Sequence, residues 1–305
     1  MSATWDADFV IVGAGPAGVA AAVMAASMRA RVLVVEAVEV GAKLAGVGAV
    51  NNVAGGWQSG PALAEALAAD LRGLEAEGLA QLVRARVVRV DVNERSARVV
   101  LDDGRVLCAP AVVVATGVRP RTVDEAPWVT TSDLAAPLPV LWQLPEGAVA
   151  PVEHVAVLGA DRPLGTWLRS HPDVDVHFDV LYVDSDAHKV SELEDEARVR
   201  LDLVERVDVA QIAGGFRLTA WHSAGGSHTF TRPAVVANLG TEAAALAGLV
   251  RDADGYCPVE LQHPRILVAG DLRSPRFQRI STAMGSGAEA VLRHTYSGSM
   301  SLQRA

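Results

Sequence analysis

Residues 9–18 read FVIVGAGPAG, and this stretch decides the fold of the chain. Four apolar residues predict a buried strand, and a run with three glycines follows them at once. The Ala-rich stretch 16–28 then predicts a helix, and RVLVVE at 31–36 predicts a second strand. A strand, a tight turn, a helix and a parallel strand make a β-α-β unit.

The glycines of this turn have the spacing G-x-G-x-x-G. Gly13 permits the tight turn, Gly15 leaves room for a pyrophosphate, and Gly18 lets the helix pack closely on the strand. The helix N-terminus then faces the phosphates, and Glu36 can accept hydrogen bonds from the adenosine ribose. The alternative is a glycine turn that holds no nucleotide. We expect a dinucleotide site here.

Composition limits the class of protein. The chain has 305 residues, enough for two domains, and 50% of them are hydrophobic against 21% charged, which is typical of globular proteins. A net charge of −9 argues against nucleic acid or an anionic membrane surface as the partner. Two distant cysteines form neither a disulfide framework nor a zinc motif, so we predict a cytoplasmic location.

One uncharged stretch, residues 9–28, has the length of a membrane span. Asp6 and Asp8 precede it where a signal peptide would carry basic residues, and glycines and a proline interrupt it. We expect a soluble protein in which this stretch forms a strand, a turn and a buried helix.

The pattern of elements occurs twice along the chain. In the first half, an amphipathic helix over 59–78 precedes β-rich runs at 82–91, 97–101 and 105–107 and a strand at 111–117. Prolines at positions 127, 137, 139, 145 and 151 predict a linker or domain crossing.

The second half starts with a strand at 155–159, a turn and a short helix. These are followed by a strand region at 174–184, a charged helix leading into a strand over 191–208, a meander with turns at 214–215 and 225–226, and a strand at 234–240. A last strand and helix over 266–294 should pack back on the first unit. The predicted fold class is α/β with two Rossmann-like dinucleotide-binding domains.

The sequence resembles the low-molecular-weight thioredoxin reductase-like flavoproteins over nearly its whole length. The likeness rests on GAGPAG, GAKLAGVGAVNNVAGG at 41–56, ATG at 115–117 and AGDLRSPRFQRISTAMGSGAEA at 269–290. It implies an FAD-binding domain from 1–122 and 238–305, with a smaller, degenerate NAD(P)H-binding-like domain from 123–237. It also implies that Asp271 bonds the ribityl chain of FAD and that the helix starting near Ile280 faces the flavin. The family is dimeric, which implies a homodimer.

The FAD contacts that the resemblance and the glycine turn together predict come from six segments. They are Gly13, Gly15, Pro16, Ala17, Gly18, Glu36, Ala37, Lys43, Asn52, Val88, Ala115, Thr116, Gly117, Gly270, Asp271, Gln278, Arg279 and Ile280.

The chain departs from the family at its second nucleotide turn, VAVLGADRPLG at 155–165. Asp161 stands where a glycine should admit the pyrophosphate, and Pro163 removes a backbone donor, although a proline is harmless in a first helical turn. The next strand ends in the acidic segment 182–186, where arginines should hold a 2′-phosphate. Arg162 could restore one phosphate contact. We nevertheless expect that the chain does not use NADPH.

The family's redox disulfide is also missing. Its motif, Cys-x-x-Cys-Asp, matches VTTSD at 129–133, so Val129 and Ser132 occupy the cysteine positions and only Asp133 remains. Cys108 and Cys257 match no redox position of the family and are interpreted as structural thiols. Without vicinal thiols there is no dithiol–disulfide exchange, and we predict no thioredoxin reductase activity.

Two residues are candidates for catalysis. The family commonly has Arg-Gln before the terminal helix, whereas this chain has Gln278-Arg279. The fixed charge of Arg279 would stabilise an anionic reduced flavin; the alternative is a contact with solvent or a partner subunit. Asp133 could serve as general acid or base.

Three functions remain open at this point. The first is an FAD-dependent oxidase or dehydrogenase of a small organic substrate. The second is a non-catalytic FAD-binding scaffold or sensor, and the third is a flavoenzyme reduced by a protein electron donor. The eight histidines show no ligand spacing along the chain, so we predict no metal site.

Overall fold

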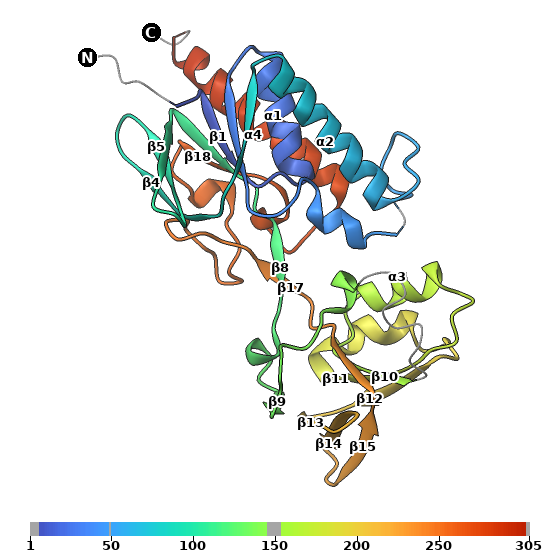
Figure 1. Ribbon diagram of the computed structural model, residues 1–305. Helices are drawn as coiled ribbons and strands as arrows, with labels where there is room; N and C mark the ends of the chain where they lie inside the picture. The colour runs from blue at the N-terminus through green and yellow to red at the C-terminus, as the bar shows by residue number, and fades with distance from the viewer. Residues whose placement is uncertain (1–5, 49, 145–153, 303–305) are drawn as a thin grey trace. The chain divides into compact units, whose positions relative to one another are not determined.

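The computed structural model describes residues 6–48, 50–144 and 154–302. The chain divides into two compact units, Met1–Arg119 with Glu242–Ala305 (unit 1) and Pro120–Thr241 (unit 2) (Figure 1). It passes between them in β8 (Val118–Pro120) and β17 (Thr241–Ala243), which pair as a two-stranded sheet.

Unit 1 is built on a five-stranded sheet of order β18-β7-β1-β2-β3, in which all neighbouring strands are parallel. The strands are β1 (Phe9–Val12), β2 (Val32–Glu36), β3 (Ala80–Arg84), β7 (Ala111–Val114) and β18 (Ile266–Val268). Helices α1 (Pro16–Ser27), α2 (Gly60–Ala76) and α4 (Ile280–Leu302) lie together beside this sheet in Figure 1. An antiparallel sheet adds β4 (Val87–Val92), β5 (Ala97–Leu101) and β6 (Val106–Ala109).

Side chains alternate along β1 between two apolar layers. Phe9 and Ile11 pack with residues of the three helices, whereas Val10 and Val12 pack with residues of the β4–β6 sheet. A parallel strand buried on both faces reads as a continuous apolar run, which explains FVIV. The predicted strand, turn and helix over 9–28 are confirmed. Within the described residues, no helix has the length and apolar character needed to cross a bilayer.

Unit 2 repeats this plan. Its parallel sheet has the order β12-β11-β10-β16, formed by β10 (His154–Leu158), β11 (His177–Tyr182), β12 (Val199–Leu203) and β16 (Ala234–Ala237). A second sheet holds β9 (Val129–Ser132), β13 (Arg206–Ile212), β14 (Gly215–Trp221) and β15 (Ser227–Arg232). Val155 and Val157 pack with α3 (Pro163–Ser170), while Ala156 and Leu158 pack with the second sheet. The predicted α/β class with two Rossmann-like domains is confirmed.

Short 3-10 segments complete the described elements. They are η1 (Ala42–Gly46), η2 (Val123–Glu125), η3 (Leu141–Gln143), η4 (Asp184–Glu192), η5 (Val259–Leu261) and η6 (Gly270–Arg273).

Two predicted segments differ in part from the structure. The run 82–91 holds the end of β3 and most of β4, which belong to different sheets. The helix predicted to begin at residue 191 is absent, because the 3-10 segment ends at Glu192. The strand predicted to follow it is confirmed, as β12 and the start of β13. Alternation decides the second case, because Val199 and Leu201 of β12 pack on the apolar core of unit 2.

The proline-rich segment is not a linker where the structure describes it. It contains β9, which pairs in parallel with β13 of unit 2, and Pro139 accepts a hydrogen bond from the backbone N–H of Ala237 (2.8 Å). Pro145 and Pro151 lie outside the described residues.

Candidate functional site

In the glycine turn after β1, two of the three glycines have no room for a side chain, whereas the third has free space beside it. A side-chain carbon at Gly13 would lie 2.6 Å from the carbonyl oxygen of Ala115, and one at Gly18 would lie 1.8 Å from that of Gly13. Both positions require glycine for packing, and Gly13 also has a φ of 98°. Apart from its chain neighbours, no atom of the described residues lies within 4 Å of a carbon added at Gly15. The turn therefore leaves space at the residue where a pyrophosphate would approach.

The first turn of α1 supports an anion at this open position. Gly15 is the N-cap residue, Pro16 occupies the first helical position, and Ala17 is buried. Because the N-terminus of a helix carries partial positive charge and outward-pointing N–H groups, it favours a phosphate.

The carboxylate of Glu36 lies at the end of β2, next to the turn. Its Oε2 accepts from the backbone N–H of Ala14 (2.7 Å), and its Oε1 accepts from that of Val38 (2.8 Å). These bonds fix the carboxylate beside the glycine turn. Ala37 follows it at an exposed position.

Residues distant in sequence meet near the start of α4. Lys43 Nζ lies 3.5 Å from Asp271 Oδ2, and the Oγ of Ser281 donates to the backbone oxygen of Asn52 (3.4 Å). The backbone N–H of Gly270 donates to Ser286 of α4 (2.7 Å). Two of the six segments of predicted FAD contacts are thus brought together in unit 1.

Gln278 and Arg279 have different surroundings. The Nε2 of Gln278 donates to the backbone oxygens of Ser274 (3.0 Å) and Asp271 (3.3 Å), which ties this loop together. Arg279 is exposed, and its guanidinium donates to the adjacent carbonyl of Gln278 (2.8 Å). Ile280, half-buried, begins α4. The guanidinium thus stands at the surface beside a helix N-terminus.

The ATG segment follows β7. Ala115 is buried and its N–H donates to Val12 (2.8 Å), while the hydroxyl of Thr116 donates to the carbonyl of Ala244 (2.7 Å). Gly117 has a φ of 66°, which favours glycine. Val88 lies on β4, at the irregularity between Val87 and Arg89, and is exposed.

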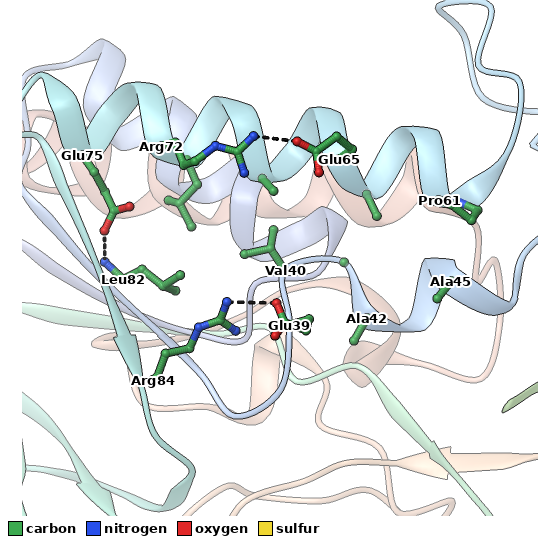
Figure 2. Close-up of a pocket in the computed structure, with 14 residues that line it drawn as sticks. Glu39, Val40, Ala42, Ala45, Pro61, Glu65, Arg72, Glu75, Leu82 and Arg84 are labelled. Carbon is green, nitrogen blue, oxygen red and sulfur yellow. Dashed lines mark hydrogen bonds and ion pairs between the residues drawn. The ribbon is translucent and has the colours of Figure 1, made fainter. Parts of the chain in front are cut away.

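A separate cavity of about 470 Å³ lies between α2, β3 and residues 39–45 (Figure 2). Ion pairs cross its lining: Arg72 with Glu65 (2.6 Å) and Arg84 with Glu39 (3.0 Å). None of the predicted FAD contacts is among the described residues that line it. It was not predicted from the sequence, because it depends on how η1 folds against α2.

The turn after β10 in unit 2 shares only its first glycine contact with the turn after β1. A carbon at Gly159 would lie 2.5 Å from the carbonyl oxygen of Asn238, as at Gly13. Asp161, however, places a carboxylate 3.9 Å from Lys189, which also pairs with Asp186 at 2.9 Å. The side-chain N–H of Asn238 donates to the backbone oxygen of Asp161 (2.7 Å). Side chains of unit 2 itself thus meet at this turn.

Two neighbouring features differ from unit 1. Helix α3 begins at Pro163, four residues after its first glycine, whereas α1 begins three residues after Gly13. Arg162 is exposed. Tyr182 ends β11, and the acidic residues that follow open η4.

The positions that match the family's cysteines lie in an extended strand. Val129 and Ser132 are the first and last residues of β9, and Asp133 follows with a φ of 57°. Asp133 is exposed and belongs to unit 2. Burial raises the pKa of both cysteine thiols, Cys108 and the fully buried Cys257. Thiols of raised pKa in such surroundings are poor nucleophiles.

Comparisons with known proteins agree with this architecture. Residues 7–129 match the family described as pyridine nucleotide-disulphide oxidoreductase. The thioredoxin reductase of Lactococcus lactis in its FR conformation is 18% identical, with a TM-score of 0.75 over 95% of this chain and 98% of that chain. The thioredoxin reductase of T. acidophilum is 19% identical, with a TM-score of 0.69 over 96% and 99%.

A thioredoxin reductase from Gloeobacter violaceus is 22% identical, with a TM-score of 0.52 over 97% of this chain and 95% of that chain. No curated protein sequence matches the chain. The chain therefore has a thioredoxin reductase-like fold, and the predicted resemblance to these flavoproteins is confirmed.

Proposed function

From this fold, we propose that the chain is an FAD-dependent oxidoreductase that neither reduces thioredoxin nor takes electrons from NADPH. The observation that carries the FAD assignment is the turn after β1. Glycine is required at positions 13 and 18, while the space at Gly15 stays open at the N-terminus of α1. The residues present fit a dinucleotide in the mode expected for FAD.

Each segment of unit 1 has a proposed role. The N–H groups at the start of α1 would hold the pyrophosphate, and Glu36 would accept hydrogen bonds from the ribose. Asp271, now beside Lys43, would bond the ribityl chain, and Arg279 would supply positive charge near the start of α4. When bound, FAD supplies the capacity to take up and release a pair of electrons.

The second nucleotide turn supports the proposal that NADPH is not the donor. A pyrophosphate at this turn would meet the carboxylate of Asp161, and a 2′-phosphate would meet Asp184 and Asp186 instead of arginines. Lys189 neutralises part of this negative charge, but its ammonium already pairs with Asp161 and Asp186.

The reaction proposed is oxidation of a small organic substrate, by an oxidase or dehydrogenase. Val129 and Ser132 stand at the positions of the family's disulfide, so these positions supply no thiol. Asp133 is the proposed general acid or base, and Arg279 the proposed cation for the reduced flavin. A homodimer and a cytoplasmic location stay predictions from the resemblance.

Anaerobic titration of the purified protein tests these assignments in order. A flavin absorption band is expected, and stoichiometric NADPH and then NADH should leave it unbleached. Photoreduced protein exposed to oxygen should then regain the band. Absence of any flavin band would refute the FAD assignment, and prompt bleaching by a pyridine nucleotide would refute the loss of the second site.

A non-catalytic FAD-binding scaffold or sensor is the second candidate, because both of the family's redox partners are altered in one chain. It predicts a bound flavin that exchanges electrons with neither dithionite nor oxygen at useful rates. A flavoenzyme reduced by a protein donor is the third. In that case the net charge of −9 would disfavour an acidic donor.

A further inference from the structure

Three potential metal ligands meet in unit 2, on strands that are apart in the sequence. Asp202 lies on β12, His222 follows β14, and His228 lies on β15. One ligand atom from each residue can be chosen so that all three lie within 4.8 Å of one another. The two imidazoles approach most closely: Nε2 of His222 is 3.1 Å from Nδ1 of His228.

The other nitrogen of each ring faces a hydrogen-bond acceptor. Nδ1 of His222 lies 3.0 Å from the backbone oxygen of Leu203, which can only accept, so this nitrogen carries a hydrogen. Nε2 of His228 lies 3.4 Å from Oδ2 of Asp202, which favours a hydrogen on that nitrogen too. In neutral rings with these hydrogens, the two nitrogens at 3.1 Å both present lone pairs.

These two nitrogens can meet in two ways. A hydrogen on Nδ1 of His228 can be donated to Nε2 of His222, or both lone pairs can hold one cation. A metal ion would accept both lone pairs and leave the two outer N–H groups to their acceptors. Ligated histidines commonly donate their second N–H to a carboxylate or a backbone carbonyl, which is the arrangement that Asp202 and Leu203 provide.

We propose that His222 and His228 form a binding site for a divalent transition ion of the zinc class, with Asp202 as the residue that orients His228. Zinc bonds of about 2.0–2.1 Å at tetrahedral angles separate two ligand nitrogens by roughly 3.3–3.4 Å. The observed 3.1 Å needs only a small opening of the pair. Water or an external ligand would fill the remaining positions.

Partial exposure allows an ion to enter. The side chains of His222 and His228 are 30% and 38% exposed, and that of Asp202 is 15% exposed. The ring of His228 stacks on Phe230 at 5.3 Å between centroids, which limits its rotation. The sites of unit 1 contribute nothing to this cluster, so the inference is independent of the proposed function.

Calorimetric titration of the full-length, untagged and EDTA-treated protein with ZnCl₂ tests the site. One ion per chain is expected, and His222→Gln or His228→Gln should weaken the affinity at least about 100-fold. Asp202→Asn should weaken it by roughly 10–100-fold, the range found for residues that orient a ligand. The matched control is His154→Gln with His177→Gln, a stacked pair in the same unit with centroids 5.3 Å apart, which should leave binding unchanged.

Electron paramagnetic resonance with Cu²⁺ gives a second readout, which identifies the ligand atoms directly. Hyperfine structure from two imidazole nitrogens is expected, reduced to one in either glutamine variant that retains the native circular dichroism. Absence of stoichiometric binding, or equal losses in the control, would overturn the proposal. So would ¹⁵N spectra that show a doubly protonated His228 in the presence of zinc.

Discussion

The ammonium of Lys189 lies 3.9 Å from the carboxylate of Asp161, at the glycine turn of unit 2. At the corresponding position in unit 1, Gly15, the structure places no described atom beyond the chain neighbours within 4 Å of an added side-chain carbon. The two units share their strand order and their first glycine but differ at the residue that a pyrophosphate would approach.

Asp161→Gly is expected to raise the affinity of the protein for NADH about fivefold. Two unit charges 4 Å apart interact by about 1 kcal/mol in water, and the substitution removes that repulsion toward a phosphate. Fluorescence titration with NADH measures the change. Asp173→Gly removes an exposed carboxylate of the same unit and should have no effect; a gain of similar size there would contradict the local explanation.

Substitution of three glycines by alanine should separate fold from ligand binding in unit 1. Gly18→Ala places a carbon against the carbonyl of Gly13 and should destabilise the protein by about 3 kcal/mol or more. Gly15→Ala should leave the free energy of unfolding of the FAD-free protein nearly unchanged but reduce flavin retention, because only the ligand's space is filled.

Gly73→Ala, in the last turn of α2 with no described atom beyond its own helix within 4 Å, is the matched control and should stabilise by up to about 0.5–1 kcal/mol. Urea unfolding and the flavin absorbance of the purified variants check all three. Full flavin retention in a folded Gly15→Ala variant would argue against the proposed phosphate position.

Restoring cysteines at positions 129 and 132 should not restore a disulfide. Residues three apart in a strand are separated by about 10 Å between Cα atoms, beyond the roughly 7 Å limit for a disulfide. Mass spectrometry after mild oxidation should find free thiols in the native Val129→Cys, Ser132→Cys variant. The same chain oxidised in urea is the control and should form the bond.

The stability of unit 1 should depend on pH through His294. Burial, aided by the charge of Arg265, holds the pKa of this imidazole below its ordinary value of 6.5. Below pH 6.5 the imidazole of His294 therefore binds a proton in the unfolded chain before it does so in the folded chain. The free energy of unfolding decreases as the pH is lowered, and this decrease ends below the pKa of the folded state.

Urea unfolding between pH 8 and pH 5 measures this dependence. His294→Gln should remove that part of the slope, whereas His188→Gln, at an exposed position, should retain it. An unchanged slope in His294→Gln would assign the acid sensitivity to other groups.

The elements of the fold were largely predictable because the apolar patterns are strong. FVIV and AVVV are buried on both faces, and Ser59 caps α2 through its Oγ, which accepts from Ala62 (3.3 Å). The helix predicted from residue 191 was wrong because charged residues alternate with apolar ones there, which is the period of a strand. The proline-rich segment was wrongly predicted for a different reason. Its strand β9 is only four residues long, too short to show a pattern among the prolines.

The candidate sites were predictable only where one short motif carries the geometry. The turn at Gly13 is local, so its spacing sufficed. The pairs Lys43 with Asp271 and Asp161 with Lys189 depend on tertiary packing, and neither pairing was predicted. His222 and His228 face each other across a hairpin turn, and their partner Asp202 comes from a different sheet. Ligand spacing along the chain does not detect such a cluster.

The close approach of α4 to α1 has a consequence for how the chain is synthesised. A carbon at Gly287 would lie 2.0 Å from the backbone oxygen of Ala17, so α4 packs directly against the backbone of α1. Unit 2 is contiguous and can fold while the ribosome is still translating. Unit 1 must wait for β18 and α4, so its N-terminal half leaves the ribosome with an apolar face uncovered until these two elements emerge.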